Sequence, residues 1–271
     1  MYTYFFSHIF FLSKTAKMPK RLALFESSKS YAKKRKYILD EALIPAHIRT
    51  APLTTVIPHL YQMYSDGYGK AKKLPKVVMK TQLYAVMESR TKADEEVQKA
   101  SAAGSIKLFK TSLGLDQYCL MLTDDYISYI KSRHPQDKLP LLLNKFVEEV
   151  VPKCGELSVN KELLLDRYRF TDSEVTDLIR YGVLTTKDFN EWWMAIPNAG
   201  AFTGDLSGGR QAVMRLVKQT THGEISVNNL LVRKLPKKCT FGWLYHLTDL
   251  LGADLLTPVE TVTGNLLRIS K

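Results

Sequence analysis

One arrangement of residues occurs three times along this 271-residue chain, and it constrains the fold more than any other feature. Each copy has apolar residues at helical spacing, then a glycine, then two short β-like runs around a polar turn; the copies lie at residues 97–123, 175–198 and 250–270. The glycines are Gly104, Gly182 and Gly252, which are 78 and 70 residues apart. A recurring pattern of this kind indicates a repeated structural unit.

The residues upstream of each glycine predict two further amphipathic helices, so each unit has three helices and a β-hairpin. Helix starts are predicted at the capping residues Thr91, Ser158, Thr171 and Ser226. The glycine is expected to end the third helix with a positive φ, which it adopts without steric cost. Three helices followed by a two-stranded wing form the winged-helix plan, and we therefore predict an α+β chain of three tandem winged-helix domains.

The predicted boundaries give a basic, disordered N-terminal arm over residues 1–40 and winged helices over residues 41–134, 135–204 and 205–271. Short links are expected near residues 135–140 and 198–209. The second link contains four glycines that would permit some motion, namely Gly200, Gly204, Gly208 and Gly209. The alternative is one larger α+β domain in which the periodicity is accidental.

The charge balance favours a polyanionic partner. The formal net charge is +12 and the isoelectric point is about 9.4, which suits nucleic acid or acidic lipid, although it also serves solubility. The N-terminal arm carries a cluster typical of nuclear import or nucleic-acid contact: Lys33, Lys34, Arg35 and Lys36. Its first 13 residues are apolar but too short to span a bilayer, and Met18 is a plausible alternative start.

The third helix of a DNA-reading winged helix normally enters the major groove, yet the predicted third helices here are not basic. The first carries Asp94, Glu95 and Glu96, the second carries Asp172, Glu174 and Asp177, and the third is almost uncharged. Its Trp243, Tyr245 and His246 are better explained by packing than by base reading. We therefore expect the first two units to bind proteins.

Cations gather instead on the first two helices of the last unit and the loop that follows. The expected DNA-binding residues are Arg210, Arg215, Lys218, Arg233, Lys234, Lys237 and Lys238, together with the arm cluster Lys33, Lys34, Arg35 and Lys36. Arg215 and Lys218 lie opposite the apolar face of their helix, so their charges should be exposed. A surface of this kind contacts phosphates and positions a protein on a duplex without reading sequence. A merely solvated face is the alternative.

No constellation of catalytic or metal-binding residues is complete. Lys80 imitates the lysine of a kinase strand and Asp188 imitates its metal-binding aspartate, but the glycine-rich loop and the catalytic Asp-Asn loop are missing. The three cysteines and six histidines are scattered, and only His246 and Asp249 suggest a pair on one helix face. Cys119, Cys154 and Cys239 indicate a reducing compartment rather than a disulfide framework. We expect no catalytic residue, no cofactor and no metal.

Residues 170–269 closely resemble the serine/threonine-protein kinase 19 family, notably "FTDSEVTDLIRYGVLTTKDFNEWWMAIPNAGAF", "GRQAVMRLVK" and "LYHLTDLLGADLLTPVETVTGNLLRI". A weaker match extends back to about Ala51. The resemblance implies three tandem winged helices in a nuclear, DNA-binding protein that is not a kinase despite the family name. It also implies a role in transcription-coupled nucleotide excision repair, with transcription-coupled repair proteins, stalled RNA polymerase and the TFIIH helicase as partners.

By position, the resemblance assigns the DNA surface to Lys218, Arg233 and Lys234 of the last winged helix. The match is incomplete, because Gln219 and Thr221 stand where the family pattern can be basic. Lys237 and Lys238 would compensate for that loss.

Three functions follow in order of preference. The first is a nuclear, chromatin-associated scaffold that binds double-stranded DNA largely through phosphates and docks repair and transcription proteins, without membrane association. The second is a winged-helix subunit that binds proteins only. The third, a protein kinase, is disfavoured because its motifs are missing.

Overall fold

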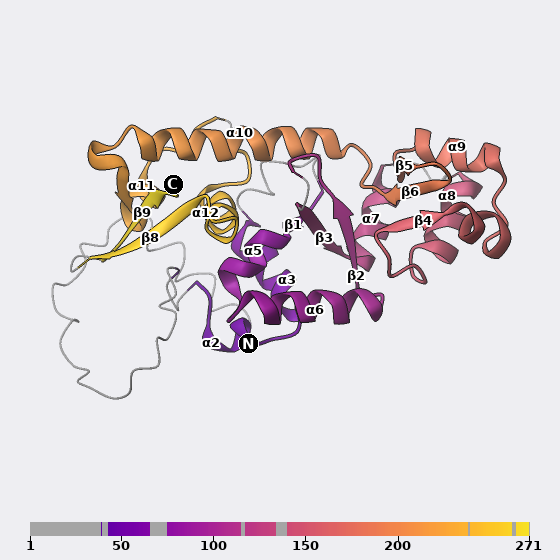
Figure 1. Cartoon of the computed structure of the whole chain (residues 1–271), viewed down its shortest axis with the longest axis horizontal. Helices are drawn as coiled ribbons and strands as arrows, with labels where there is room; N and C mark the ends of the chain where they lie inside the picture. Colours follow the sequence, from indigo (N-terminus) through magenta and orange to yellow (C-terminus); the bar gives the residue numbers. More distant parts are fainter. Residues whose placement is uncertain are drawn as a thin grey trace. The chain divides into compact units, whose positions relative to one another are not determined.

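The computed structural model describes residues 39, 43–65, 75–114, 117–133, 140–237, 239–261 and 264–270. Residues 38–271 form one compact unit, which is described here (Figure 1). The arm cluster Lys33 to Lys36, the expected link at residues 135–139 and Lys238 lie outside the described residues. Three segments within the compact unit, called repeats 1, 2 and 3, each contain helices and one three-stranded sheet.

Repeat 1 begins after the short helix α2 (Ala46–Arg49) and is followed by α7 (Thr123–Ser132). Its elements are, in order, α3 (Leu53–Met63), β1 (Val78–Met79), α5 (Lys80–Val86), α6 (Arg90–Ala102), β2 (Ile106–Lys110) and β3 (Tyr118–Leu122). Strand β3 lies between β1 and β2 and is antiparallel to both, with Leu108 opposite Leu120 in the hairpin. The single strand before the second helix thus completes the sheet that the hairpin begins.

Repeat 2 has the same order of elements with less regular helices. They are α8 (Leu141–Lys145), which continues into the π-helical η1 (Phe146–Val150), then β4 (Ser158–Asn160), η2 (Leu163–Arg167), α9 (Asp172–Arg180), β5 (Leu184–Asp188) and β6 (Glu191–Met194). Strand β6 is central and antiparallel to β4 and β5.

Repeat 3 starts with the longest described helix, which spans 20 residues. Its elements are α10 (Ala199–Lys218), the turn η3 (Thr221–Gly223), β7 (Glu224–Ser226), α11 (Val227–Val232), α12 (Trp243–Gly252), β8 (Leu256–Thr261) and β9 (Gly264–Ile269). Strand β9 is central and antiparallel to β7 and β8. The expected mixed α+β fold is confirmed, and the helix, strand, helix, helix, hairpin order recurs in all three repeats.

The predicted link at residues 198–209 is wrong, because Asn198 is the N-cap residue of α10 and the other residues of this stretch belong to the helix. The expected boundary between residues 204 and 205 therefore falls inside a continuous helix. Four glycines lower the intrinsic helix propensity of this stretch. The apolar face nevertheless continues through buried Phe202, Leu206, Val213 and Val217, and burying that face stabilises the helix against the glycine penalty.

Two of the three marker glycines have the expected backbone, and the third has another role. Gly104 and Gly182 follow α6 and α9 with φ of 72° and 75°. Gly252 is instead the last residue of α12, and Asp254 takes the left-handed turn with φ of 55°. An ideal Cβ at Gly252 would lie 1.6 Å from the carbonyl oxygen of Thr81 in α5. Glycine is required there by close packing between two helices.

The capping predictions are half correct. Thr171 forms a reciprocal capping box with Glu174, and the Ser226 hydroxyl accepts from the Asn229 backbone, as expected. The cap of α6 is Ser89 rather than Thr91, since its hydroxyl accepts from the Lys92 backbone. Ser158 lies in β4, and the side chain of Asn160 accepts from the Leu163 backbone in its place.

Candidate nucleic-acid interface

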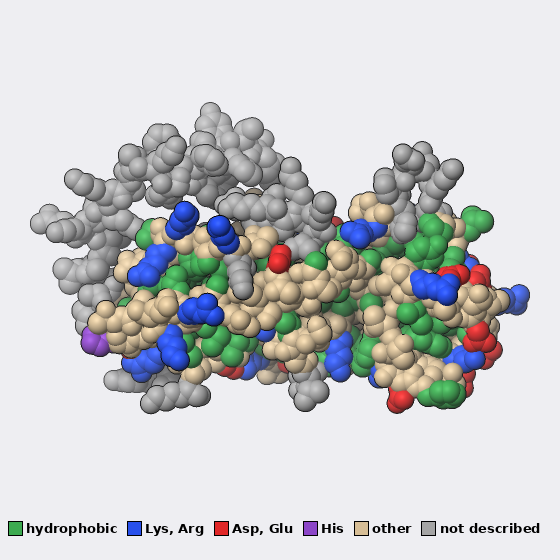
Figure 2. Space-filling view, turned by 90° about the horizontal axis from the view of Figure 1, so that it is seen from above, with side chains coloured by type: hydrophobic (Ala, Val, Ile, Leu, Met, Phe, Trp, Pro, Cys, Tyr) green, Lys and Arg blue, Asp and Glu red, His purple; other side chains and the backbone are tan. Residues whose placement is uncertain are grey.

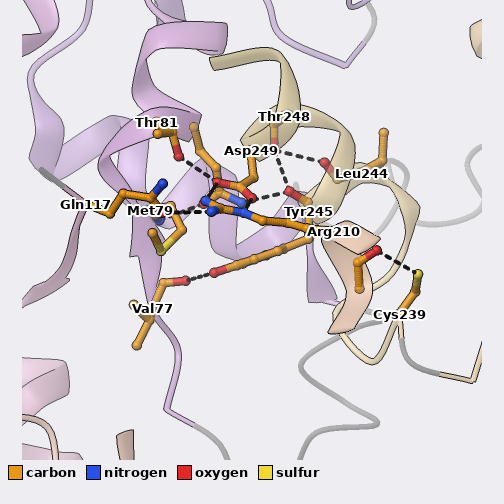
Figure 3. A network of polar contacts seen from close by, with 12 residues as sticks. Val77, Met79, Thr81, Gln117, Arg210, Cys239, Leu244, Tyr245, Thr248 and Asp249 are labelled. Carbon is orange, nitrogen blue, oxygen red and sulfur yellow. Dashed lines mark hydrogen bonds and ion pairs between the residues drawn. The ribbon is translucent and has the colours of Figure 1, made fainter. Parts of the chain in front are cut away.

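Arg210 does not belong to an exposed cationic surface. Its Nε and Nη2 donate to the two carboxylate oxygens of Asp249 at 2.6 and 2.8 Å, and its Nη1 donates to Gln117 at 2.7 Å. Arg210 is only 8% exposed and Asp249 is fully buried (Figure 3). Burial by itself would lower the pKa of Arg210, but the Asp249 carboxylate raises it. The prediction that Arg210 contacts DNA is therefore corrected.

The buried position of Arg210 follows from the helical period. It lies four residues after buried Leu206 and three residues before buried Val213, so it shares their face of α10. The apolar spacing in the sequence contained this information. Its carboxylate partner lies 39 residues further along the chain, where no local pattern points to it.

The third helix of repeat 3 is enclosed by the protein. Tyr245, Leu247 and Leu250 of α12 are fully buried, as are the polar residues His246, Thr248 and Asp249. Helix α12 packs against α5 of repeat 1, where the Gln82 amide donates to the Tyr245 carbonyl at 2.9 Å. Elsewhere in repeat 1, the Tyr64 hydroxyl hydrogen-bonds to the Thr248 hydroxyl at 2.6 Å. The expectation that the aromatic residues of this helix serve packing is confirmed. This helix cannot enter a DNA groove while it contacts repeat 1.

His246 and Asp249 do not form the helix-face pair suggested by the sequence. The Asp249 carboxylate accepts from Arg210 and from the Thr81 hydroxyl. The two ring nitrogens of His246 are buried without a hydrogen-bond partner among the described residues, and burial lowers the pKa of this imidazole to about 4. His246 is a neutral core residue.

Five predicted DNA-binding cations are exposed. They are Arg215 and Lys218 on α10, and Arg233, Lys234 and Lys237 in the segment after α11. Among the described residues, no carboxylate forms an ion pair with any of the five. The Trp243 indole donates to the Arg233 carbonyl at 2.9 Å and so fixes the backbone at the start of this segment. We call these five residues the cationic set.

The distribution of charge differs between repeats. Seen from above, Lys and Arg side chains gather around the C-terminal part of α10 and its neighbours, whereas Asp and Glu side chains lie among Lys and Arg side chains over repeat 2 (Figure 2). In α9, Asp172 pairs with Lys161 at 2.8 Å and Asp177 pairs with Arg180 at 2.9 Å. In α6, Asp94 pairs with Lys80 at 2.7 Å. Several acids of these third helices are therefore partly neutralised by neighbours.

Kinase-like residues are not brought together. Lys80 is the first residue of α5 and not part of a strand, and its ammonium is held by Asp94. Asp188 ends β5 in repeat 2, next to Phe189, which is 89% exposed. Among the described residues, no group of His, Cys, Asp or Glu has the arrangement to hold a metal ion, and no helix is long and apolar enough to cross a membrane.

Sequence reasoning missed the contacts that join repeats 1 and 2. Lys107 of β2 is buried and donates to the carbonyl of Cys154, and burial lowers its pKa. Two lysines lie over the ring of Trp193 in β6. One is Lys187 of repeat 2, and the other is Lys110 of repeat 1, whose ammonium is 5.0 Å from the ring centroid. The sequence signal for these contacts was Lys107, a lysine within an otherwise largely apolar strand.

Comparison with known proteins places these features in a family. Residues 64–269 match the family described as "Inactive serine-threonine protein kinase 19". The chain is 31% identical over 250 residues to "Winged helix repair factor 1" of Mus musculus, covering 88% of this chain and 98% of that protein. It is 32% identical over 213 residues to the protein of the same name from Homo sapiens, covering 79% and 84%.

A more distant relative bears a kinase name. It is the "Serine/threonine-protein kinase mug51" of Schizosaccharomyces pombe. The two are 24% identical over 224 residues, which cover 78% of this chain and 72% of that protein. The family description calls the family inactive, in agreement with the incomplete kinase motifs.

Proposed function

Since this chain belongs to the inactive serine-threonine protein kinase 19 family, we propose that it is a nuclear DNA-repair scaffold of three winged-helix domains that binds duplex DNA mainly through phosphates. The three domains correspond to repeats 1 to 3, whose elements share one order. The relatives named winged helix repair factor support both the fold and the role in repair. The protein acts as a binding module and performs no phosphoryl transfer.

The observation that carries the proposal is the contrast within repeat 3. Its third helix is enclosed, while the cationic set on α10 and after α11 is exposed and has no carboxylate partner among the described residues. Exposed cations of this kind neutralise phosphates and release the counterions condensed on the duplex, and that release favours binding. Contacts of this type orient a protein on a duplex and are insensitive to sequence.

Repeats 1 and 2 serve as docking surfaces for other proteins in this proposal. The third helix of repeat 1 carries exposed Glu95, which has no ion-pair partner among the described residues, and a groove-reading winged helix would bring this helix close to phosphates. Like-charge repulsion disfavours DNA there. Transcription-coupled repair proteins, stalled RNA polymerase and the TFIIH helicase are the partners we propose.

The salt dependence of duplex binding tests the proposal. If all five cations contact phosphates, the logarithm of the binding constant should fall against the logarithm of the salt concentration with a slope of about −4 to −5. Reversing Lys218, Arg233 and Lys234 to glutamate should abolish binding at moderate salt. Binding that is absent even at low salt would favour a subunit that contacts only proteins.

A kinase function is tested separately. ATP turnover by the full chain should equal that of Lys80→Ala, because Lys80 is engaged by Asp94 and lies on a helix rather than on the strand that carries the kinase lysine. A turnover that requires Lys80 would refute the proposal that the chain is no enzyme.

A further inference from the structure

Repeat 3 contains a second helix, α11, whose outer face has no partner among the residues that the structure describes. Helix α11 follows β7 directly and contacts β7, α12 and β9, and β7 in turn contacts α10 (Figure 1). Its inner side is fixed by buried Leu230, and its start is fixed by the Ser226 cap. The cationic set therefore lies on both sides of α11 along the chain, with Lys218 before it and Arg233 after it.

The outer side of α11 presents two amides and one apolar side chain. Asn228 and Asn229 are exposed, and Val232 is 82% exposed. Val232 lies four residues after Asn228 and three after Asn229, so the three side chains share one face of the helix. We call them the α11 face. Arg233 and Lys234 follow it directly, and both are exposed.

The chemistry of this face matches the edges of A·T base pairs. An asparagine amide can donate to and accept from adenine at the same time, and an apolar side chain packs against the thymine methyl group in the major groove. A largely exposed valine gains nothing from water, whereas a desolvated contact with a methyl group is favourable. The neighbouring cations complement the phosphates that border a groove.

Resting on the duplex binding proposed above, we propose that the α11 face enters a groove of double-stranded DNA and contacts base edges there. The second helix of repeat 3 thus takes the position that the enclosed α12 cannot take. The cationic set supplies the sequence-independent affinity, and the α11 face adds a preference for A·T pairs. Asn229 and Val232 are the specificity-determining residues in this arrangement.

Binding of the full chain to duplexes of one length, measured at several salt concentrations, tests this assignment. Val232→Ala and Asn229→Ala should each weaken binding to an A·T-rich duplex about threefold to tenfold without changing the salt slope. Arg233→Ala should weaken binding to A·T-rich and G·C-rich duplexes equally and reduce the slope by about 1. Phe189→Ala, which removes another exposed apolar side chain from the hairpin of repeat 2, is the matched control and should change neither quantity.

Base composition provides the second measurement. The wild-type chain should bind the A·T-rich duplex about threefold to tenfold more tightly than the G·C-rich duplex, and the ratio should approach one in Asn229→Ala/Val232→Ala. Unchanged affinity in both single variants, or a ratio that persists in the double variant, would overturn the assignment while leaving phosphate binding intact. If Arg233→Ala and the charge reversals also have no effect, the proposed duplex binding itself fails.

Discussion

Arg210 of α10 and Asp249 of α12 form a buried, two-point ion pair that also contacts repeat 1. Both carboxylate oxygens accept from the guanidinium, while Gln117 accepts a further hydrogen bond from Arg210 and Thr81 donates to Asp249 (Figure 3). Gln117 precedes β3 and Thr81 lies in α5, so the pair connects repeat 3 with two parts of repeat 1. Because the Arg210–Asp249 pair is buried between the two repeats, its role is structural, although Arg210 was predicted to contact DNA.

Removal of one partner of this pair should destabilise the fold strongly. Arg210→Met leaves a fully buried carboxylate without its counter-ion, which costs about 3 to 5 kcal/mol. Arg210→Met/Asp249→Leu removes both charges and should recover much of that loss. Urea denaturation of the three chains measures the difference. A double variant that is no more stable than the single variant would contradict this account.

The buried imidazole of His246 should make stability fall in acid. Its pKa is lowered from 6.5 to about 4 in the folded chain, because burial disfavours the charged ring. Between about pH 6.5 and pH 4 the unfolded chain therefore binds more protons than the folded chain, so the free energy of unfolding rises with pH in this window. His246 thereby contributes about 3 kcal/mol to the pH dependence of the free energy of unfolding. This contribution is fully present above pH 6.5 and is lost as the pH falls toward 4.

His246→Phe removes this titration and should flatten the profile of unfolding free energy between pH 4 and pH 6.5. His47→Gln is the matched control, since His47 is exposed. Urea denaturation at half-unit pH steps compares the three chains. If the profile of His246→Phe keeps the steepness of the wild-type profile, another group is responsible for the acid sensitivity.

The Lys80–Asp94 pair should be of little consequence for stability. Its two side chains are 24% and 49% exposed, and solvent screens such pairs. Lys80→Ala should lower the free energy of unfolding by less than about 1 kcal/mol and leave duplex binding unchanged. Thermal denaturation and a binding titration check both statements. A loss of DNA affinity in this variant would place repeat 1 on the duplex.

The repeated pattern of helix, glycine and hairpin predicted the mixed fold and the hairpin of each sheet, because amphipathic periods and turn residues are local signals. It did not predict the third strand of each sheet, which is β1, β4 or β7. The buried state of α12 was also visible, since "WLYHLTDLLG" is almost free of charge. What the sequence could not reveal are contacts between distant residues. The Arg210–Asp249 pair and the Lys107–Cys154 hydrogen bond join segments 39 and 47 residues apart, and no local pattern encodes them.

The candidate site was predictable in part: the sequence indicated which side chains of α10 are exposed, but not every residue assigned to the site. Arg215 and Lys218 were correctly placed on the exposed face of α10 by the helical period, and the same period would have excluded Arg210. The glycines of α10 predicted a link because glycine has a low intrinsic helix propensity. Tertiary packing of Phe202 and Leu206 decides the conformation there, and it depends on residues elsewhere in the chain.

Two glycine substitutions should have opposite effects on stability, and together they test whether α12 packs against α5 as described. At Gly252 an added methyl group would overlap the Thr81 carbonyl, so Gly252→Ala must separate the two helices. We expect a loss of about 2 to 4 kcal/mol, in line with severe overpacking. At Gly204, inside α10, an added Cβ meets no atom within 4 Å. Gly204→Ala should therefore stabilise the chain by about 0.5 to 1 kcal/mol, because alanine restricts the unfolded chain and favours a helix.

Thermal and urea denaturation of the two single variants and the wild-type chain measure both changes in stability. Gly204→Ala also serves as the control for the Gly252 variant, since the two substitutions are chemically identical and both lie in helices. A Gly252→Ala chain as stable as the wild type would mean that repeats 1 and 3 are not in contact through α5 and α12. In that case α12 would be free to approach a duplex, and the reason for assigning base contacts to α11 would disappear.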